Sequence, residues 1–381
     1  MNILVFSFSG GKCGSTINLG YIIKILSKKN HQVSVLYSKK DLGLKYLAEN
    51  GGNIIFNRFP FGMNTAAVLE NSGNPRVRII LQSLKDLIRA PFGFFLSIYY
   101  IKKFNPDVVF LADLIFPQVA LGCLCLKIPV VCAIQSEIIK GNFGLRKNMT
   151  IYVLNKSNLL FGITQRHLAP FLEKADDYSK YSVIPNTSEL IKDKKKEDEY
   201  KMSFDKIHIP TNHKIILFLG GNINFKGSTL VKNIAEISNI SDKKYFFIVA
   251  GPTQDKFQKN NIVFVGEEID ALRLIKSSDL LIVANTFPHF SRPVIEAFMI
   301  KTPVLAINDA FTRSLIVNNR NGFLIKGRDP SAWLKRIDKI FEDKQTYQKV
   351  KANAFATFAE KHNSLDVEKS IMNVFDIAYR K

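Results

Sequence analysis

The chain has 381 residues, with 53 Lys and Arg against 33 Asp and Glu, so its formal net charge is +20. Hydrophobic residues make up 46% and charged residues 23%, which is typical of globular proteins and excludes a disordered, fibrous or low-complexity chain. The length indicates two domains, and the 4 cysteines lack the spacing of a disulfide framework or a zinc site.

The first 40 residues are typical of a β-α-β unit, which implies a parallel sheet with helices on its faces. An apolar run of strand length, Ile3–Ser9, ends at a turn over residues 10–15. The amphipathic segment Thr16–Asn30 predicts a helix, and Val33–Tyr37 the next strand. Further buried strands are predicted at Asp107–Leu111, Pro129–Ile134 and Leu159–Thr164.

Basic residues alternate with aromatic and aliphatic ones between Arg78 and Phe104. Two interpretations stay open: a pair of helices packed into the core, or a surface that faces a membrane and receives a lipid-linked acceptor. Because Pro lacks an N–H donor and clashes with the preceding turn, Pro91-Phe92-Gly93 predicts a break in any single long helix here.

A second α/β series follows a charged stretch, Lys192–Lys206, which is typical of a linker or an exposed helix. Its strands are predicted at Ile215–Leu219, Tyr245–Ala250, Ile262–Val265, Leu280–Ala284 and Val304–Ile307. Its helices are predicted from about Thr229, at about Asp270–Lys276, Pro293–Ile300 and Pro330–Phe341, and as two helices between about Lys344 and Tyr379. Ligands of open parallel sheets bind at the carboxyl ends of strands, so the default site lies between the two halves.

Several motifs follow one another in a fixed order. The opening GGKCGST precedes a helix and NHQVSVL, PDVVFLAD covers residues 106–113, and IPVVCAIQSE covers residues 128–137. In the second half come IPN at 184–186, FLGGNINFKG at 218–227 and FPHFSRPVIEAFMIKTPVLA at 287–306. This ordered set resembles the retaining GT-B glycosyltransferases of family 4, the glycogen-synthase-like glycosyl transferases group 1.

The resemblance implies an α/β protein of GT-B fold, with two Rossmann-like, doubly wound parallel-sheet domains facing across a cleft. It implies an N-terminal acceptor-binding domain at residues 1–186, a linker at 187–212 and a C-terminal nucleotide-sugar-binding domain at 213–362. The helix within residues 363–381 is expected to cross back onto the first domain.

The donor half carries the residues to which we assign catalysis. Ser291-Arg292-Pro293 opens a predicted helix, whose free N–H groups and positive dipole suit a departing nucleoside diphosphate. By resemblance, Glu296 binds the ribose hydroxyls and Lys226 neutralises the diphosphate. Without the resemblance, Glu296 is an ordinary first-turn acid and Lys226 a surface lysine. The catalytic residues are therefore predicted to be Lys226, Arg292 and Glu296.

The donor half departs from the family pattern at two positions. The family's first Glu falls on Pro288, so a sugar contact is lost, and the adjacent His289 is either its substitute or a solvent-exposed residue. The family's phosphate-binding Arg falls on Gly221, and we expect the guanidinium of Arg292 to restore that charge. The donor-binding residues are predicted to be Gly11, Gly221, Asn222, Lys226, Val265, His289, Phe290, Ser291, Arg292 and Glu296.

The acceptor half is predicted from the ends of its strands. Neither G-x-G-x-x-G nor G-x-x-x-x-G-K-[ST] is present and residues 37–40 hold no acid, which disfavours a nicotinamide site. Gln135 stands where the family has a His, and Gln cannot carry a proton at neutral pH. Asp113 and Glu137 are either acceptor contacts or simple loop acids. The acceptor-binding residues are predicted to be Gly10, Lys12, Asp113, Gln135 and Glu137.

The resemblance implies a metal-independent, retaining hexosyltransferase with a nucleoside-diphosphate sugar as donor substrate and no cofactor. Its expected acceptor is a surface polysaccharide, such as lipopolysaccharide, or a lipid-linked oligosaccharide. Two alternatives stay open: a GT-B sugar-nucleotide epimerase, or a catalytically degenerate protein that binds nucleotide sugar or membrane.

Charge and hydropathy bear on partners and location. Lysines spread along the chain disfavour nucleic acid as a partner, whereas a charge of +20 suits an acidic membrane surface. No apolar run reaches the ~18 residues of a membrane span, and the opening residues lack the pattern of a secretory signal. We therefore expect a cytoplasmic protein, with the cytoplasmic face of the inner membrane as a candidate peripheral location.

Overall fold

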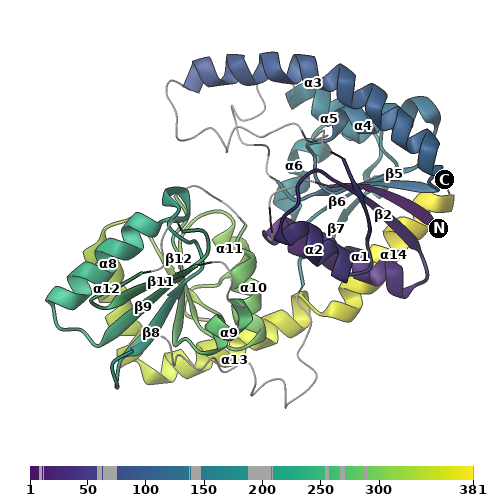
Figure 1. Cartoon of the computed structure of the whole chain (residues 1–381). Helices are drawn as coiled ribbons and strands as arrows, with labels where there is room; N and C mark the ends of the chain where they lie inside the picture. Colours follow the sequence, from purple (N-terminus) through teal and green to yellow (C-terminus); the bar gives the residue numbers. More distant parts are fainter. Residues whose placement is uncertain are drawn as a thin grey trace. The chain divides into compact units, whose positions relative to one another are not determined.

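The structure is a computed structural model of the chain, and it describes residues 1–7, 11, 13–57, 62, 75–136, 138, 147–187, 207, 209–253, 257–266, 271–286, 288 and 290–380. The side chains of residues 75–79, 81, 82 and 85 are also outside the described part. The chain divides into two compact units, Met1–Asn186 with Leu365–Lys381, and Thr187–Ser364. Each unit has a central sheet with helices on its faces (Figure 1).

The sheet of the first unit contains seven parallel strands within the described residues, in the order β3-β2-β1-β4-β5-β6-β7. In its register, Val5 of the first strand pairs with Val35 on one side and with Phe110 on the other. The strands are β1 (Asn2–Phe6), β2 (Gln32–Tyr37), β3 (Asn53–Phe56), β4 (Val108–Leu111), β5 (Val130–Ile134), β6 (Leu159–Gly162) and β7 (Tyr181–Val183).

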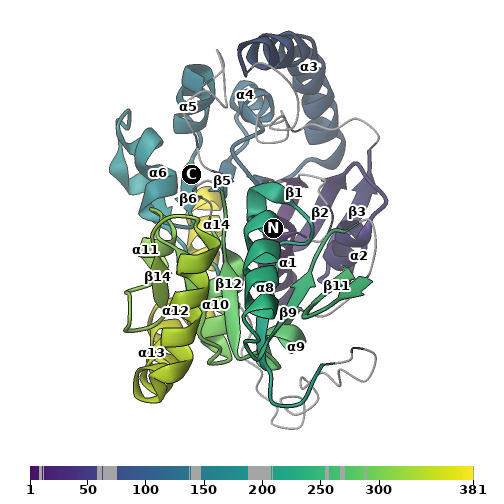
Figure 2. The same ribbon diagram turned by 90° about the vertical axis from the view of Figure 1, so that its left-hand side faces the viewer.

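Helices cover both faces of this sheet, which explains why its central strands are continuous apolar runs. The helices are α1 (Gly14–Lys28), α2 (Leu42–Glu49), α3 (Pro75–Phe104), α4 (Pro117–Leu126), α5 (Lys147–Asn155), α6 (Gln165–Leu172), the 3-10 turn η3 (Tyr178–Lys180) and α14 (Ser364–Arg380). Alternate strand residues such as Val5 and Phe110 pack against α1, α2 and α14. Their neighbours, such as Leu4 and Val109, pack against α3, α4, α5 and α6. Figure 2 shows α3 and α4 together on one side of this sheet and α1 and α2 on the other.

The last helix, α14, belongs to the first unit although the whole second unit precedes it in the chain. Its residues Val367, Ile371, Val374 and Phe375 are buried in the core of the first unit. The Phe375 ring meets the Phe110 ring edge to face, with 5.3 Å between the centroids. The apolar face of this helix thus completes a core that residues 1–186 do not fill alone.

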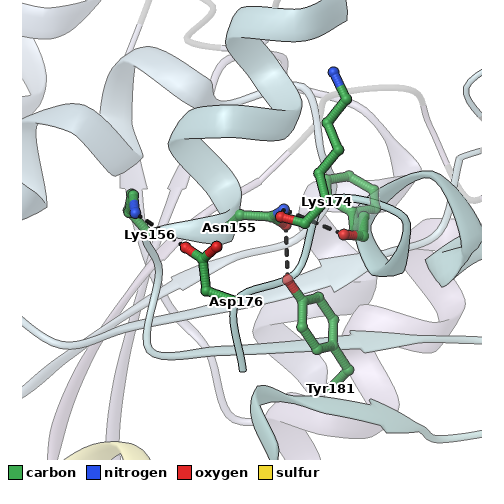
Figure 3. Close-up of polar contacts among 6 residues, drawn as sticks. Asn155, Lys156, Lys174, Asp176 and Tyr181 are labelled. Carbon is green, nitrogen blue, oxygen red and sulfur yellow. Dashed lines mark hydrogen bonds and ion pairs between the residues drawn. The ribbon is translucent and has the colours of Figure 1, made fainter. Parts of the chain in front are cut away.

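The ends of α5, α6 and β7 are joined by the side-chain amide of Asn155 (Figure 3). Its Nδ2 donates to the carbonyls of Phe171, at 3.2 Å, and Lys174, at 3.0 Å, and its Oδ1 accepts from Tyr181 Oη at 2.9 Å. Phe171 lies in the last turn of α6 and Lys174 just after it, so the amide ties the end of α6 to α5 and to β7.

The predicted break at Pro91-Phe92-Gly93 is wrong, because α3 runs without interruption from Pro75 to Phe104 with Pro91 inside it. Proline removes the N–H that would bond to the carbonyl of Leu87, one turn earlier. Both Pro91 and Leu87 are exposed, so water can satisfy that carbonyl and the helix continues. The region is one helix, and not the pair of helices that formed the first interpretation.

The second sheet also has seven strands within the described residues, in the order β10-β11-β9-β8-β12-β13-β14. Neighbouring strands are parallel except for the antiparallel pair of β10 and β11. The strands are β8 (Lys214–Phe218), β9 (Tyr245–Ala250), β10 (Phe257–Lys259), β11 (Ile262–Gly266), β12 (Leu280–Val283), β13 (Val304–Ile307) and β14 (Phe323–Ile325).

Helices lie on both sides of the second sheet (Figure 1). They are the 3-10 turn η4 (Asn224–Lys226), α8 (Ser228–Ile240), α9 (Ala271–Lys276), α10 (Arg292–Met299), α11 (Thr312–Leu315), α12 (Pro330–Glu342) and α13 (Lys344–Lys361). Trp333 and Ile337 of α12 pack with strand residues such as Phe247 in one buried cluster. Asp329 starts α12, because its carboxylate accepts from the Ser331 and Ala332 N–H groups.

Two α/β units with parallel central sheets confirm the predicted fold class of each domain, and the antiparallel strand β10 at one edge was not predicted. The sequence did not predict the strands β3, β7, β10 and β14 or the helices α2, α6 and α11. The charged stretch Lys192–Lys206, predicted as a linker or an exposed helix, lies outside the described residues.

Candidate active site

The candidate site of the second unit lies where the order of its sheet reverses. β9 and β11 continue the sheet on one side of β8, whereas β13 and β14 continue it beyond β12. Open parallel sheets bind ligands at the carboxyl ends of the strands, at such a reversal. The segments that follow β8 and β12, residues 219–227 and 284–291, therefore form the candidate site, and residues 287 and 289 lie outside its described part.

These two segments are hydrogen bonded to each other. Thr286 donates to the Phe225 carbonyl through its N–H, at 2.8 Å, and through its hydroxyl, at 3.1 Å. Gly227 has a φ of +101°, and a Cβ at this position would overlap the Ala284 carbonyl. Only glycine combines this backbone conformation with so close an approach, so Gly227 lets the two segments meet.

Gly221 and Asn222, two predicted donor contacts, lie against the end of β9. Gly221 has a φ of +58° and donates its N–H to the Ala250 carbonyl at 2.8 Å. The N–H of Asn222 donates to the Pro252 carbonyl at 2.7 Å, and its side-chain oxygen accepts from Lys232 Nζ at 2.6 Å. Both residues thus fix the start of the segment after β8.

Lys226, a predicted catalytic residue, ends the turn η4 in this segment. Its N–H donates to the Ile223 carbonyl at 3.1 Å, and its ammonium lies 5.6 Å from the centroid of the Phe225 ring. The ring face attracts the ammonium group and so helps to hold it in place. The ammonium is a compact cation, which suits a phosphate oxygen.

The segment after β12 leads into the start of α10. Phe290 is buried and Pro288 is exposed. Ser291 is the N-cap residue and has extended backbone, but its side chain makes no capping hydrogen bond. The Val294 N–H donates to the Ser291 carbonyl at 3.1 Å, but no side chain caps the N-terminal end of α10, which carries the positive end of the helix dipole.

Two predicted catalytic residues, Arg292 and Glu296, lie one turn apart on α10 and form an ion pair. Arg292 Nε lies 2.8 Å from Glu296 Oε1, and each side chain is 10% exposed. Arg292 Nη1 is buried and has no hydrogen-bond partner among the described residues. Hydrogen bonds to ionised groups are worth about 1.5–3 kcal/mol, so a buried guanidinium donor without an acceptor favours binding of an anion.

Sequence reasoning missed this pairing, because it assigned Arg292 to phosphate and Glu296 to ribose separately. The spacing of four residues could have revealed it, since side chains at i and i+4 are neighbours on a helix. The structure thus brings two predicted residues together and gives the carboxylate an internal partner.

Arg328 also lies at this edge and was missed by sequence reasoning. Its guanidinium donates to the carbonyls of Ala284, at 3.2 Å, and Asn285, and so holds the start of the segment after β12. Burial lowers the pKa of Arg328, and Asp309 opposes that shift. No motif marked Arg328, because it follows β14, a strand that the sequence did not predict.

The remaining predicted residues of this half lie farther along the sheet or outside the described part. Val265 is buried in β11, which β9 separates from β8. His289 lies outside the described residues. Within the described part of the chain, no group of three or more His, Cys, Asp or Glu side chains could hold a metal ion.

The first unit has its own reversal, between β1 and β4. Gly11, which follows β1, donates its N–H to Asp41 Oδ2 at 3.1 Å. The other oxygen of Asp41 accepts from the hydroxyl of Tyr37, at 2.9 Å, and from the N–H of Leu44 at the start of α2. The sequence holds no acid at residues 37–40, but Asp41 stands one position later. Its carboxylate bonds to groups of the protein itself.

Asp113, a predicted acceptor contact, follows β4 and is buried. Its carboxylate accepts from the N–H groups of Leu114, Gln135 and Ser136, at 2.8, 3.1 and 3.0 Å, and from the Ser136 hydroxyl. Burial raises the pKa of Asp113, and these hydrogen bonds oppose the rise. The side chain thus ties the end of β4 to the end of β5.

Gln135 lies at the end of β5 within a small polar network. Its Nε2 donates to the Ala112 carbonyl at 2.8 Å, and its Oε1 accepts from Asn18 of α1 at 3.3 Å. His167, which sequence reasoning missed, makes a hydrogen bond with the backbone of Gln135, and its Nδ1 lies 2.8 Å from Thr164 Oγ1. Burial, with a smaller effect of Arg166, lowers the pKa of His167 to about 4, so its imidazole is neutral at pH 7.

The neutral His167 therefore holds the backbone of Gln135, the residue predicted to stand where the family has a His. The signal that could have identified His167 is its position just after the predicted strand Leu159–Thr164. The other predicted acceptor residues, Gly10, Lys12 and Glu137, lie outside the described residues.

Residues 200–357 match the family model described as "Glycosyl transferases group 1". The chain is 20% identical over 317 residues to the capsular polysaccharide biosynthesis glycosyltransferase CapM of Staphylococcus aureus, covering 80% of this chain and 76% of that protein. It is 24% identical over 192 residues to the uncharacterized glycosyltransferase MJ1607 of Methanocaldococcus jannaschii, covering 47% and 49% of the two chains.

Solved structures share the fold over nearly the whole chain. HepE of Anabaena, in complex with UDP-glucose, superposes with a TM-score of 0.75 at 16% identity, covering 99% of each chain. A mutant of S. aureus TarM, in complex with fondaparinux, α-GlcNAc-glycerol and UDP, gives a TM-score of 0.68 at 11% identity, covering 98% of this chain and 99% of that chain. The fold is GT-B.

Proposed function

We propose that this chain, a GT-B glycosyltransferase whose residues 200–357 belong to glycosyl transferases group 1, is a retaining hexosyltransferase that uses a nucleoside-diphosphate sugar. The proposed acceptor is a surface polysaccharide or a lipid-linked oligosaccharide, and the proposed location is cytoplasmic. The observation that carries the proposal is Arg292 Nη1, buried at the start of α10 without an acceptor among the described residues. A diphosphate oxygen supplies both the acceptor and the negative charge that this group requires.

The proposed donor is a UDP-sugar. HepE and TarM, two structural relatives, were solved with UDP-glucose and with UDP. In the proposed complex, Arg292 and Lys226 contact the diphosphate, while Glu296 accepts from the ribose hydroxyls through the oxygen that Arg292 Nε does not engage. Base contacts near Val265 and sugar contacts from His289 complete the donor site proposed for the second unit, and Gly11 remains a proposed donor contact.

The transfer breaks the bond between the anomeric carbon and the diphosphate oxygen. The acceptor oxygen bonds to the same carbon on the same face, and its proton passes to the departing phosphate. Negative charge develops on the leaving group, and we assign its stabilisation to Arg292, Lys226 and the start of α10 rather than to a metal ion. Removing one such donor lowers kcat by about 100- to 1,000-fold in comparable sites.

On the acceptor side, we propose that Gln135 rather than Asp113 contacts the substrate. The Asp113 carboxylate already accepts four hydrogen bonds within the protein, so its proposed role is to hold the backbone of Gln135 and Ser136. Gln135 is half-buried and held by Asn18 and Ala112, which leaves it a defined orientation for a sugar hydroxyl. Gly10, Lys12 and Glu137 remain proposed acceptor contacts.

Thermal unfolding in the presence of UDP, GDP or ADP tests the donor assignment. A ligand at 100 times its Kd stabilises the folded state by about 2.7 kcal/mol, so UDP is expected to raise the Tm and Glu296→Ala to abolish the shift. Lys226→Ala is expected to weaken the shift, whereas Lys244→Ala, at an exposed lysine before β9, serves as the matched control.

The absence of a shift with every nucleotide would contradict the proposal. Transfer from a radiolabelled UDP-sugar, with and without EDTA, then tests turnover and metal independence. The anomeric configuration of the product, read by NMR, tests retention separately.

A further inference from the structure

The outward face of α3 carries a stripe of large apolar side chains that are exposed to solvent. Their spacing of three or four residues places them on one side of the helix. Leu87 is 72% exposed, Ile88 77% and Phe95 69%. The members of this α3 stripe are Ile80, Leu84, Leu87, Ile88, Phe92, Phe95 and Tyr99.

The opposite face of α3 is fixed to the first unit, against α4. Ser97 and Ile101 are buried, and Leu96 and Tyr100 pack against the core. Gly93 brings the helix so close to Gln118 of α4 that an added Cβ would lie 3.2 Å from that side chain. Figures 1 and 2 both show α3 along the outer side of the α4 layer. The stripe therefore cannot turn inward without detaching the helix, and contiguous exposed patches of this kind mark interaction surfaces.

Charge indicates which partner fits this surface. The sequence of α3 holds six basic residues and one acid, Asp86, which is buried. Lys103 Nζ lies 5.7 Å from the Tyr99 ring centroid and 5.8 Å from that of Phe104, at the end of the stripe. A cation held beside aromatic rings at the border of an apolar face is typical of helices that lie in a membrane interface.

A second copy of this chain fits the same surface less well. In a twofold dimer the same patch faces itself, so the basic residues of the two α3 helices would meet like charges. Acidic lipid headgroups neutralise those charges while the acyl region accepts the apolar side chains. Within the described residues, no helix is long and apolar enough to cross a membrane.

We propose that the α3 stripe binds the surface of an acidic lipid bilayer, with α3 lying in the plane of the headgroups. Leu87, Ile88 and Phe95 enter the boundary of the acyl chains, and Arg89, Lys102 and Lys103 contact the headgroup phosphates. Binding to a bilayer would suit a lipid-linked acceptor. The α3 stripe is a different surface from the donor site, so binding to it is tested without a nucleotide.

Sedimentation with vesicles of phosphatidylcholine and phosphatidylglycerol tests this surface in the full chain. We expect the protein to sediment with the mixed vesicles and to remain in solution with pure phosphatidylcholine. Leu87→Gln/Ile88→Gln/Phe95→Gln is expected to weaken binding at least ~100-fold, since each buried apolar side chain contributes about tenfold or more. Ile240→Gln/Val317→Gln/Leu365→Gln, at three exposed apolar positions outside α3, is the matched control.

A charge variant separates the electrostatic part of the binding. Each basic residue near an acidic membrane contributes about fivefold to partition, so Lys102→Gln/Lys103→Gln should weaken binding by about 25-fold. Lys344→Gln/Lys349→Gln, two exposed lysines on α13, should not change it. All variants are checked for an unchanged circular dichroism spectrum and Tm.

Two results would overturn the proposal: no sedimentation of the wild-type protein with acidic vesicles at low salt, or equal binding by the α3 triple variant. A dimer that this variant converts to a monomer, without vesicle binding by the wild type, would assign the stripe to self-association and also refute it. The donor-site assignment is tested separately, because Glu296→Ala should keep vesicle binding and the α3 variants should keep the UDP shift.

Discussion

The ion pair on α10 allows a quantitative test of the donor site through Arg292→Leu. The substitution leaves the Glu296 carboxylate without its partner in a site where both side chains are 10% exposed. Loss of one partner from a buried ion pair costs about 3–5 kcal/mol. Because some solvent reaches this pair, we expect about 3 kcal/mol of lost unfolding free energy, measured by urea denaturation.

The double variant Arg292→Leu/Glu296→Leu separates stability from binding. It removes both charges from the site, and replacing a buried pair by apolar residues is often neutral or stabilising. We therefore expect its unfolding free energy to return to within about 1–2 kcal/mol of the wild type. UDP binding should not return, because the charge-assisted hydrogen bond from Arg292 is still missing.

Isothermal titration calorimetry measures the binding part. Loss of a hydrogen bond to a charged group costs about 1.5–3 kcal/mol, so the Kd for UDP should rise by about 10- to 150-fold in Arg292→Leu. Arg313→Leu, at an exposed arginine of α11, is the control and should bind UDP as the wild type does. If the folded single variant Arg292→Leu binds UDP with the wild-type Kd, Arg292 does not contact the diphosphate and the assignment is wrong.

Three further substitutions test individual contacts. Gly227→Ala should lower the unfolding free energy by about 3 kcal/mol or more, because a Cβ there overlaps the Ala284 carbonyl, whereas Gly327→Ala, with φ +76° but open space around it, should cost only about 1 kcal/mol. His167 binds its proton below pH 6.5 in the unfolded chain but only near pH 4 in the folded one, so stability should fall by about 3 kcal/mol as the pH drops through this window. In His167→Gln the urea midpoints should lose that part of the pH slope, and an unchanged slope would contradict the lowered pKa. Arg328→Met should raise the KM for the donor with an unchanged circular dichroism spectrum, and an unchanged KM would show that its bond to the Ala284 carbonyl does not order the site.

The central strands could be predicted from the sequence because they are buried on both faces. β4, β5, β9 and β12 are continuous apolar runs, and each lies inside its sheet. The missed strands β3, β7, β10 and β14 are the outer strands of the two sheets. β3 is half-buried, β10 is exposed, and β7 and β14 have three residues each, so none of them shows the long apolar pattern that marks a buried strand.

The candidate site could be predicted only where its residues are close in sequence. The motif at residues 287–306 identified Arg292 and Glu296, and their spacing on one helix determines their contact. His167 and Arg328 act through residues 32 and 44 positions away, Gln135 and Ala284, so only the folded chain reveals their contacts. Pro91 shows the reverse case, in which a strong local signal is overridden because Leu87, whose carbonyl loses its N–H partner, is an exposed residue.

The crossing of α14 onto the first unit has a consequence for synthesis on the ribosome. Phe110 is made early, but its edge-to-face partner Phe375 emerges only after the entire second unit. The nascent first unit must therefore wait with an uncovered apolar surface, while Thr187–Ser364 has every residue it needs to fold first. Stop codons or proteolysis that remove α14 would leave this surface open and expose the truncated chain to aggregation and chaperone capture.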